Sequence, residues 1–409
     1  MRRLLRIAVR NVWRHPRRTA ITCGAVALGV TGIVVAAGFV DFTLWGLRQA
    51  IVYGGLGHLQ ILPARVDPRA RLDRAAIDAA DEVLRRMPLV DAVAPRLEIQ
   101  GLVSAGSRTL TFTGVGVEER AEPKVRALTM LTGGQWFTGE ERVPQVLLGR
   151  GLAERLHVRP RAMLALIAYS DRGSMSATDA QVAGIFESGV LEYDARTLLM
   201  PIRTARDLME TNAASALVVL LREDVGAGAA TDTTEAATAL RRHLAAMHVA
   251  VRVASWHELS PIYGGVVRLY RWILNVFLVI VTLVVVLGIA NTMSMAVFER
   301  GAEIGMLRAL GFGAGRVLAM ILVEAATIGA LGATAGMGIG AAACVALSAV
   351  GIDMPPPPGQ SQGYVAQVRI VPEAFAVAAA IAVGAAVLAA IVPSLRAIRG
   401  EVADVLRAG

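Results

Sequence analysis

Residues 21–40 read ITCGAVALGVTGIVVAAGFV, a run of twenty residues without a charged side chain. At about 1.5 Å of rise per residue, a helix of this length matches the roughly 30 Å hydrocarbon core of a bilayer. The run therefore predicts a retained transmembrane helix over 19–41. A cleavable signal peptide is the alternative, but its apolar core is only about 7–15 residues long, and Ala36-Ala37-Gly38-Phe39 makes a poor cleavage site.

Three further apolar stretches predict transmembrane helices over 268–298, 317–350 and 373–393, so that the chain crosses the membrane four times. The third stretch is longer than one crossing needs and is rich in glycine, which favours one tilted or bent helix over two short ones. The composition agrees with a membrane protein, because 55% of the residues are hydrophobic and only 18% are charged. Soluble domains average about 45–50% and about 25%, respectively.

Arginines in the short flanking segments indicate the orientation of the spans. The formal net charge is +8. Segments 1–18, 299–316 and 394–409 hold 13 basic and 4 acidic residues, a net of +9, whereas the other 28 basic and 29 acidic residues leave −1. By the positive-inside rule these three segments are cytoplasmic, as an amphipathic arm, a short connection between the second and third spans, and a tail. The positive charge then reports topology in the inner (cytoplasmic) membrane and contact with membrane lipids, so no nucleic acid partner is expected.

The segment between the first two spans is too long for a simple loop and predicts a stalk and an extracytoplasmic (periplasmic core) domain over 42–267. Alternating or short apolar runs indicate strands, and amphipathic runs indicate helices. The predicted strands are Gly57–Leu62, Leu110–Val115, Gln145–Leu148 and Ala216–Leu221, and the predicted helices are Asp73–Met87 and Thr234–Met247. The expected fold is therefore an α-helical membrane protein with four transmembrane helices and a large α+β extracytoplasmic domain, of one or two lobes, inserted between helices 1 and 2.

Two segments join this domain to the spans. Residues 41–56 and 256–271 carry apolar residues at helical spacing among tryptophans and tyrosines, so they are expected to leave the bilayer as helices. They serve either as a force-transmitting stalk or as interfacial anchors. Within the outer loop 351–372, the proline run of Met354–Gly359 predicts exposed, extended backbone.

Catalytic patterns are missing from the sequence. Its histidines form no H-E-x-x-H motif, so no metal is expected. Cys23 and Cys344 lie in apolar runs and are expected to be packing residues. Lys124 is the one lysine and stands outside any G-x-x-x-x-G-K-[ST] loop, so the chain is not expected to hydrolyse ATP or to bind a cofactor itself.

Glu324 is an ionisable residue within an apolar span, where a charge is costly and usually functional. Because it lies about two turns after Arg316, we expect it near the cytoplasmic interface, paired with a neighbouring helix in a structural or coupling role. A proton relay is the less favoured alternative.

Residues 291–311 read NTMSMAVFERGAEIGMLRALG and predict that the second span ends in a short amphipathic helix. Its charged residues are Glu299, Arg300 and Glu303, and its apolar anchors are Ile304, Leu307 and Leu310. A helix of this kind can dock in a groove of a soluble partner. A solvated turn is the alternative interpretation.

The same residues match throughout the pattern N-T-M-x-M-x-V-x-E-R-x-x-E-I-G-x-L-R-A-L-G, and here the chain resembles the FtsX-like permease family of ABC transporters. Segments 8–19 and 392–407 resemble the two ends of that family. The resemblance implies that segment 299–316 is a cytoplasmic coupling helix, which contacts a separate dimer of ABC ATPase subunits that bind ATP and Mg. The coupling residues so implied are Glu299, Arg300, Glu303, Ile304, Gly305, Leu307, Arg308, Ala309, Leu310 and Gly311.

The resemblance also implies a permease subunit, paired with a second copy or a sister permease, that couples ATP hydrolysis to extraction or export of an amphiphile, a lipoprotein or lipid, by mechanotransmission. MacB exporters carry their ATPase fused at the amino terminus, and this chain is expected to differ from them. Its layout is similar to that of the lipoprotein-releasing LolC/LolE permeases, notably at Leu56–Ile61. Alternatives are an FtsX-like transmembrane regulator of extracytoplasmic hydrolases and an exporter of a peptide or drug. The sequence leaves open the substrate, the composition of the permease pair and a periplasmic partner.

Overall fold

The computed structural model describes residues 16–65, 67, 70–127, 129–137, 143–222, 229–310, 312–356 and 360–399. The chain divides into two compact units. The first, here called the helical unit, comprises 1–45, 266–354 and 365–409, and the second, called the sheet unit, comprises 46–265 and 355–364. Most of the predicted amino-terminal arm and the end of the predicted tail lie outside the described residues.

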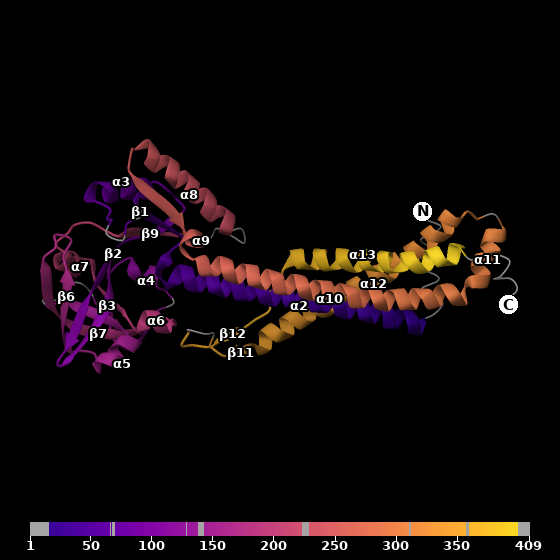
Figure 1. Cartoon of the computed structure of the whole chain (residues 1–409), viewed down its shortest axis with the longest axis horizontal. Coiled ribbons are helices and arrows are strands. Elements are labelled where there is room, and N and C mark those ends of the chain that lie inside the picture. The colour runs from indigo at the N-terminus through magenta and orange to yellow at the C-terminus, as the bar shows by residue number, and fades with distance from the viewer. Residues whose placement is uncertain are drawn as a thin grey trace. The chain divides into compact units, whose positions relative to one another are not determined.

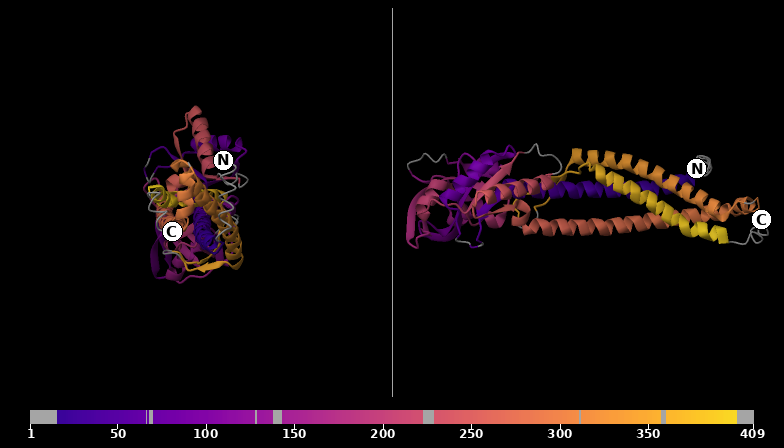
Figure 2. Two further views of the ribbon diagram at one scale, coloured as in Figure 1. Left: turned by 90° about the vertical axis from the view of Figure 1, so that its right-hand side faces the viewer. Right: turned by 90° about the horizontal axis from the view of Figure 1, so that it is seen from above.

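Four long helices build the helical unit (Figure 1). They are α2 (Pro16–Ile51), α10 (Pro261–Glu299), α12 (Ala314–Val350) and α13 (Pro372–Arg399). Among the described residues, these four helices are long and apolar enough to cross a membrane. Figure 2 shows them again from above and from one end. The helices extend beyond the predicted spans, because α2 continues to Ile51 and α10 begins at Pro261, so the stalk segments are direct continuations of the spans.

Glycines on α12 set how closely the helices approach. Gly332, Gly336 and Gly340 face α2, and Gly329 faces α13. A Cβ atom on Gly336 would lie 2.6 Å from the carbonyl oxygen of Ala27, a distance that real side chains do not reach. Small residues at this spacing allow two helix backbones to pack closely, as is common in membranes. The shared core contains Val26, Val30, Val34, Ile289, Met293, Ala325, Ile328, Ala386 and Ala390.

The segment entering α13 is tied to the second half of α2. The backbone N–H of Arg369 donates to the carbonyl of Gly38 at 3.2 Å, and its guanidinium lies 3.2 Å from the carboxylate of Asp41 and over the ring of Trp45. The outer loop predicted as extended also contains a small two-stranded sheet of β11 (Ile352–Met354) and β12 (Tyr364–Ala366). Part of its proline run, residues 357–359, lies outside the described residues.

A ten-stranded mixed sheet forms the sheet unit. Its strands are β1 (Leu59–Pro63), β2 (Val90–Ala105), β3 (Arg108–Val117), β4 (Met130–Gly134), β5 (Gln145–Gly149), β6 (Met163–Tyr169), β7 (Met175–Glu187), β8 (Thr197–Pro201), β9 (Ala216–Leu221) and β10 (Val251–Ser255). Its helices are the π-helical turn η1 (Val52–Leu56), α3 (Arg74–Arg85), α4 (Glu122–Val125), α5 (Arg150–Leu156), α6 (Leu191–Asp194), α7 (Ile202–Met209), α8 (Ala229–Ala246) and α9 (Trp256–Leu259). The four predicted strands and both predicted helices are confirmed.

The sheet unit has two lobes that share strand β2. In the first lobe the strands β2, β3, β8, β5, β7 and β6 pair in a closed ring, because β6 returns to β2. Its core is apolar and includes Leu97, Phe112, Leu148, Leu166 and Met200. In the second lobe the first half of β2 continues through β9 and β1 to β10, and α3 and α8 pack on this part of the sheet. Strand β2 is long enough, at 16 residues, to serve both.

The close approach of α12 to α2 can be tested by adding single methyl groups. We predict that Gly336→Ala destabilises the protein by about 1–3 kcal/mol, because the new Cβ overpacks against backbone atoms of α2. Gly338→Ala is the matched control, because a Cβ there meets nothing within 4 Å. Thermal unfolding in one detergent measures both variants. If the two variants melt at the same temperature, α12 does not pack closely against α2 at Gly336.

Candidate functional site

The connection between α10 and α12 is the candidate site. Helix α10 ends at Glu299, Arg300 adopts a non-helical backbone, and the short helix α11 runs over Gly301–Ala309. Helix α12 begins at Ala314, after an extended Gly313. The helix is thus shorter than the predicted segment 299–316, whose last residues already belong to α12. Gly311, which the resemblance includes, lies outside the described residues.

A buried ion pair fixes this connection to α12. One terminal nitrogen of Arg300, Nη1, donates to both carboxylate oxygens of Glu324, at 3.1 and 3.0 Å. The side chains are only 15% and 10% exposed. The intramembrane charge of the sequence therefore has its partner in the residue that precedes α11. A buried pair of this kind contributes little net stability, but it penalises every arrangement that separates its charges.

A second ion pair joins α10 to the start of α2. The Nη1 atom of Arg18 lies 3.0 Å from a carboxylate oxygen of Glu299, and Nη2 of Arg18 donates to the carbonyl of Thr292. These side chains are more exposed, at 25% and 43%, so the pair is weaker than the buried one. The two pairs use adjacent residues, Glu299 and Arg300, and hold the end of α10 against two different helices.

The inward face of α11 differs from the prediction. Ile304, expected to be an anchor for a partner, is buried in the core of the helical unit with Met293 and Ile321, and Gly305 is buried as well. Ile304 follows Arg300 by one helical turn and therefore points the same way as the buried ion pair. Leu307 and Arg308 are half-buried. Ile304 is thus a core residue in the single chain, and its role in coupling stays a prediction.

The outward face of α11 and its flanks carries several large apolar side chains beside the charged Glu303. Met306 is 62% and Leu310 is 72% exposed, and Phe298 and Phe312 are exposed too. Glu303 and Ala309, both named from the sequence, are exposed on the same helix. Sequence reasoning missed Met306, Phe298 and Phe312, although the spacing of four residues between Met306 and Leu310 is the signal that could have identified this face.

The interior of the site has little room for a ligand. Two small cavities of about 20 and about 40 Å³ flank the Arg300–Glu324 pair, which suffices for single water molecules. Among the described residues, no group of three or more His, Cys, Asp or Glu side chains is placed to hold a metal ion. The described part of the site is built to hold helix ends together and to present an outer surface.

Comparison with known proteins identifies the class. The profile of the MacB-like periplasmic core domain matches residues 19–237, more than half of the chain, and that of the FtsX-like permease C-terminal region matches residues 275–402. The chain therefore belongs to the family of ABC transporter permeases that combine these two regions. The resemblance found in residues 291–311 is confirmed.

Individual relatives are distant. The macrolide export ATP-binding/permease protein MacB of Agrobacterium fabrum is 25% identical over 351 residues, which cover 82% of this chain and 52% of that protein. The lipoprotein-releasing system transmembrane protein LolE of Haemophilus influenzae is 21% identical over 290 residues, which cover 70% of this chain and 67% of that protein. The chain thus spans about half the length of the MacB protein. The solved periplasmic region of MacB from Actinobacillus actinomycetemcomitans matches with 15% identity, covers 52% of this chain and 94% of that one, and has a TM-score of 0.38.

Removing the carboxylate of the buried ion pair should lower the free energy of unfolding much more than removing the carboxylate of the exposed pair. We predict that Glu324→Gln destabilises the protein by about 3–5 kcal/mol, because it leaves the guanidinium of Arg300 buried without its counter-charge. The matched control Glu299→Gln should cost less than about 1 kcal/mol, because its partner is more exposed and keeps the Thr292 carbonyl. Thermal unfolding in detergent checks both.

A double variant separates charge from packing at the same site. Arg300→Met with Glu324→Leu should recover most of the stability lost in Glu324→Gln, because an apolar pair of similar volume avoids the unpaired charge. If Glu324→Gln and Glu299→Gln unfold at the same temperature, the buried pair does not hold the connection.

Proposed function

We propose that the chain is the permease subunit of an ABC transporter and that α11 is its contact with a separate ATPase subunit. The observation that carries this proposal is the exposed apolar face of Met306 and Leu310 on a helix anchored from behind by a buried ion pair. A surface helix that binds nothing gains nothing from large exposed apolar side chains. A rigidly mounted apolar face with Glu303 beside it suits a groove on a soluble partner.

The mounting of α11 supports coupling as well as binding. Because Arg300 and Glu299 connect to α12 and α2, a displacement of α11 by the ATPase would act on three of the four long helices. In this proposal the partner ATPase dimer binds ATP and Mg, and the movement passes along α2 and α10, both of which contain residues of the helical and the sheet unit. The output is mechanical work on a cargo at the outer leaflet.

The apolar surface of α10 supports an amphiphilic cargo and a paired permease. Large side chains on several faces of this helix are exposed in the single chain, including Trp272, Val279, Ile280, Leu283, Val284 and Leu287. Lipid, a second copy or a sister permease, and the apolar part of a lipoprotein or lipid cargo could all cover such a surface. The names of the relatives, which mention macrolide export and lipoprotein release, agree with an amphiphile.

The docking face can be tested by placing charges on it. We predict that Met306→Glu and Leu310→Glu each reduce co-purification with the cognate ATPase, and ATP turnover of the assembled complex, about tenfold or more, because an unpaired charge would be buried in the interface. The matched control is Met130→Glu, which places the same charge at a residue of similar exposure, 60%, in β4. Wild-type binding by both α11 variants would refute the ATPase contact.

The proposed orientation makes a separate prediction. In intact cells, a single cysteine at Pro356 should react with a membrane-impermeant maleimide, whereas one at Glu303 should react only after the inner membrane is opened, because arginine-rich flanks remain cytoplasmic. Cys23 and Cys344 are first replaced by Ala. If Glu303→Cys is labelled in intact cells and Pro356→Cys is not, the chain is inserted the other way round.

A further inference from the structure

The outer end of α2 finishes in a turn that only glycine permits. The helix passes into η1, whose Gly55 has a φ of +126°, and Gly57 follows with a φ of +70°. A Cβ on Gly57 would lie 2.4 Å from a methyl carbon of Val218. The chain then enters β1, which lies between β9 and β10 in the sheet. The turn thus joins the helix to an interior strand, with its last carbonyl groups in need of hydrogen-bond donors.

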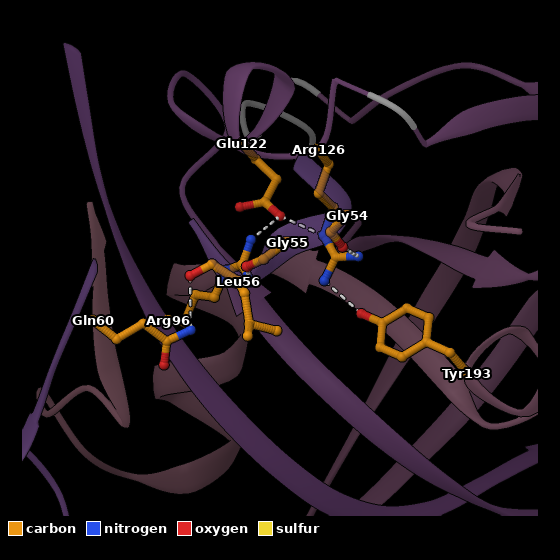
Figure 3. A network of polar contacts seen from close by, with 8 residues as sticks. All are labelled: Gly54, Gly55, Leu56, Gln60, Arg96, Glu122, Arg126 and Tyr193. Carbon is orange, nitrogen blue, oxygen red and sulfur yellow. Dashed lines mark hydrogen bonds and ion pairs between the residues drawn. The ribbon is translucent and has the colours of Figure 1, made fainter. Parts of the chain in front are cut away.

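Two buried arginines supply these donors (Figure 3). Arg96 on β2 donates from Nη1 to the carbonyl of Gly55, and Arg126, which follows α4, donates from Nη1 to the carbonyl of Gly54 at 3.4 Å. Both also bind one oxygen of Glu122, at 2.7 Å from Arg96 and 2.6 Å from Arg126. The remaining Arg126 nitrogen, Nη2, donates to the hydroxyl of Tyr193. We call Arg96, Glu122, Arg126 and Tyr193 the capping cluster.

The helix end offsets part of the net positive charge of the capping cluster. Arg96, Glu122 and Arg126 are at most 8% exposed. Burial lowers the pKa of Arg96, an effect that Glu122 opposes, and guanidinium groups stay protonated in proteins. Two positive charges therefore face one carboxylate. The carboxyl end of a helix carries roughly half a negative charge, so the Gly54 and Gly55 carbonyls supply part of what is missing.

The start of α10 belongs to the same region of the sheet unit. Trp256, which is 1% exposed, packs in one apolar cluster with Val52 of η1 and Val125 of α4. Tyr263 of α10 contacts the Trp256 ring edge-on, with ring centroids 4.6 Å apart. The guanidinium of Arg48 on α2 lies over the Trp256 ring, 5.8 Å from its centroid. The end of α2 and the beginning of α10 are thus fixed to the same part of the sheet.

From this geometry we infer that the capping cluster is a rigid joint through which α2 moves the sheet unit. The inference rests on the proposed function, because a joint matters only if a helix movement is transmitted. A buried ion cluster is a poor source of stability, since apolar residues of similar volume often serve as well or better. What it provides is a single allowed position of the helix end, because any displacement of Gly54 and Gly55 leaves two buried guanidinium groups short of acceptors.

The joint can be tested in the full-length chain without any partner. Spin labels at Ala50 on α2 and Arg108 on the β2–β3 hairpin report the distance distribution between helix end and sheet in lipid nanodiscs, after Cys23 and Cys344 are replaced by Ala. In Arg126→Lys the charge is kept, but an ammonium group cannot reach Glu122, Gly54 and Tyr193 together. We expect the distribution to broaden about twofold or more while the circular dichroism stays that of the wild type.

Two further variants make the result decisive. Arg96→Met with Glu122→Leu and Arg126→Met replaces the cluster by apolar residues and should fold yet show the same broadening. Arg150→Lys is the matched control, because Arg150 pairs with Glu154 and Glu187 in the same unit but is itself 55% exposed, and it should leave the distribution unchanged. If both cluster variants keep the wild-type width of the distance distribution, the cluster is not a rigid joint. If neither variant folds, the cluster is a requirement for folding and the inference is also wrong.

A second measurement separates the joint from the proposed function. In the complex with the cognate ATPase, trapping with ATP and vanadate should change the distance between Arg108 labels on two paired permeases. Arg126→Lys should keep ATP turnover within about twofold and reduce this change about threefold. If the wild-type complex shows no change on trapping, the proposed function fails, whereas the joint is still judged by the Ala50–Arg108 distribution.

Discussion

The packing of α12 against α2 through Gly332, Gly336 and Gly340 is the contact on which the helical unit depends. Because these residues lack side chains, the two backbones approach closely enough for Thr31 of α2 to donate a hydrogen bond to the carbonyl of Gly336 at 3.1 Å. The same approach brings the start of α2 and the first half of α12 to the end of α10. The Arg18–Glu299 and Arg300–Glu324 pairs both require that proximity. Both ion pairs therefore depend on the close packing of the α2 and α12 backbones.

Buried charge is used in the same way in both units. In each, a carboxylate from one element is shared with or bound by arginines that contact the end of a long helix: Glu324 at the end of α10, and Glu122 at the end of α2. Both clusters are costly to desolvate, and apolar residues of similar volume often stabilise a protein as well or better. Their common effect is to specify the position of a helix end. Positions of this kind are the ones that matter if helix movement is the output of the protein.

The sequence was sufficient for the parts of the fold that follow from local patterns. Long apolar runs identified the four long helices, alternation identified β3, and a short apolar run identified β9. The closed ring of β2, β3, β8, β5, β7 and β6 could not be predicted, because it depends on which distant strands pair. The same limit applies to the site. The pattern of residues 291–311 located α11, but it could not show that Ile304 is buried, because that depends on the packing of α11 against α12. Arg96, Glu122 and Arg126 were missed because their spacing in sequence has no meaning until β2 and α4 meet at Gly54 and Gly55.

Helix α10 packs against the rest of the helical unit through a narrow stripe of buried side chains. Val285, Ile289 and Met293, spaced four residues apart, are its buried side chains in the core of the helical unit, and large apolar side chains on its other faces are exposed. Within a bilayer there is no hydrophobic force between helices, so an association through α10 depends on shape and on small residues. Its exposed stretch from Leu269 to Leu287 is dominated by large and β-branched side chains, which do not allow the close approach that glycines give α12 and α2. Under the proposed function, a permease pair that meets through α10 would therefore separate more easily than α2 from α12, so that α2 and α12 of each permease stay together and the opening for an amphiphile forms between the two permeases.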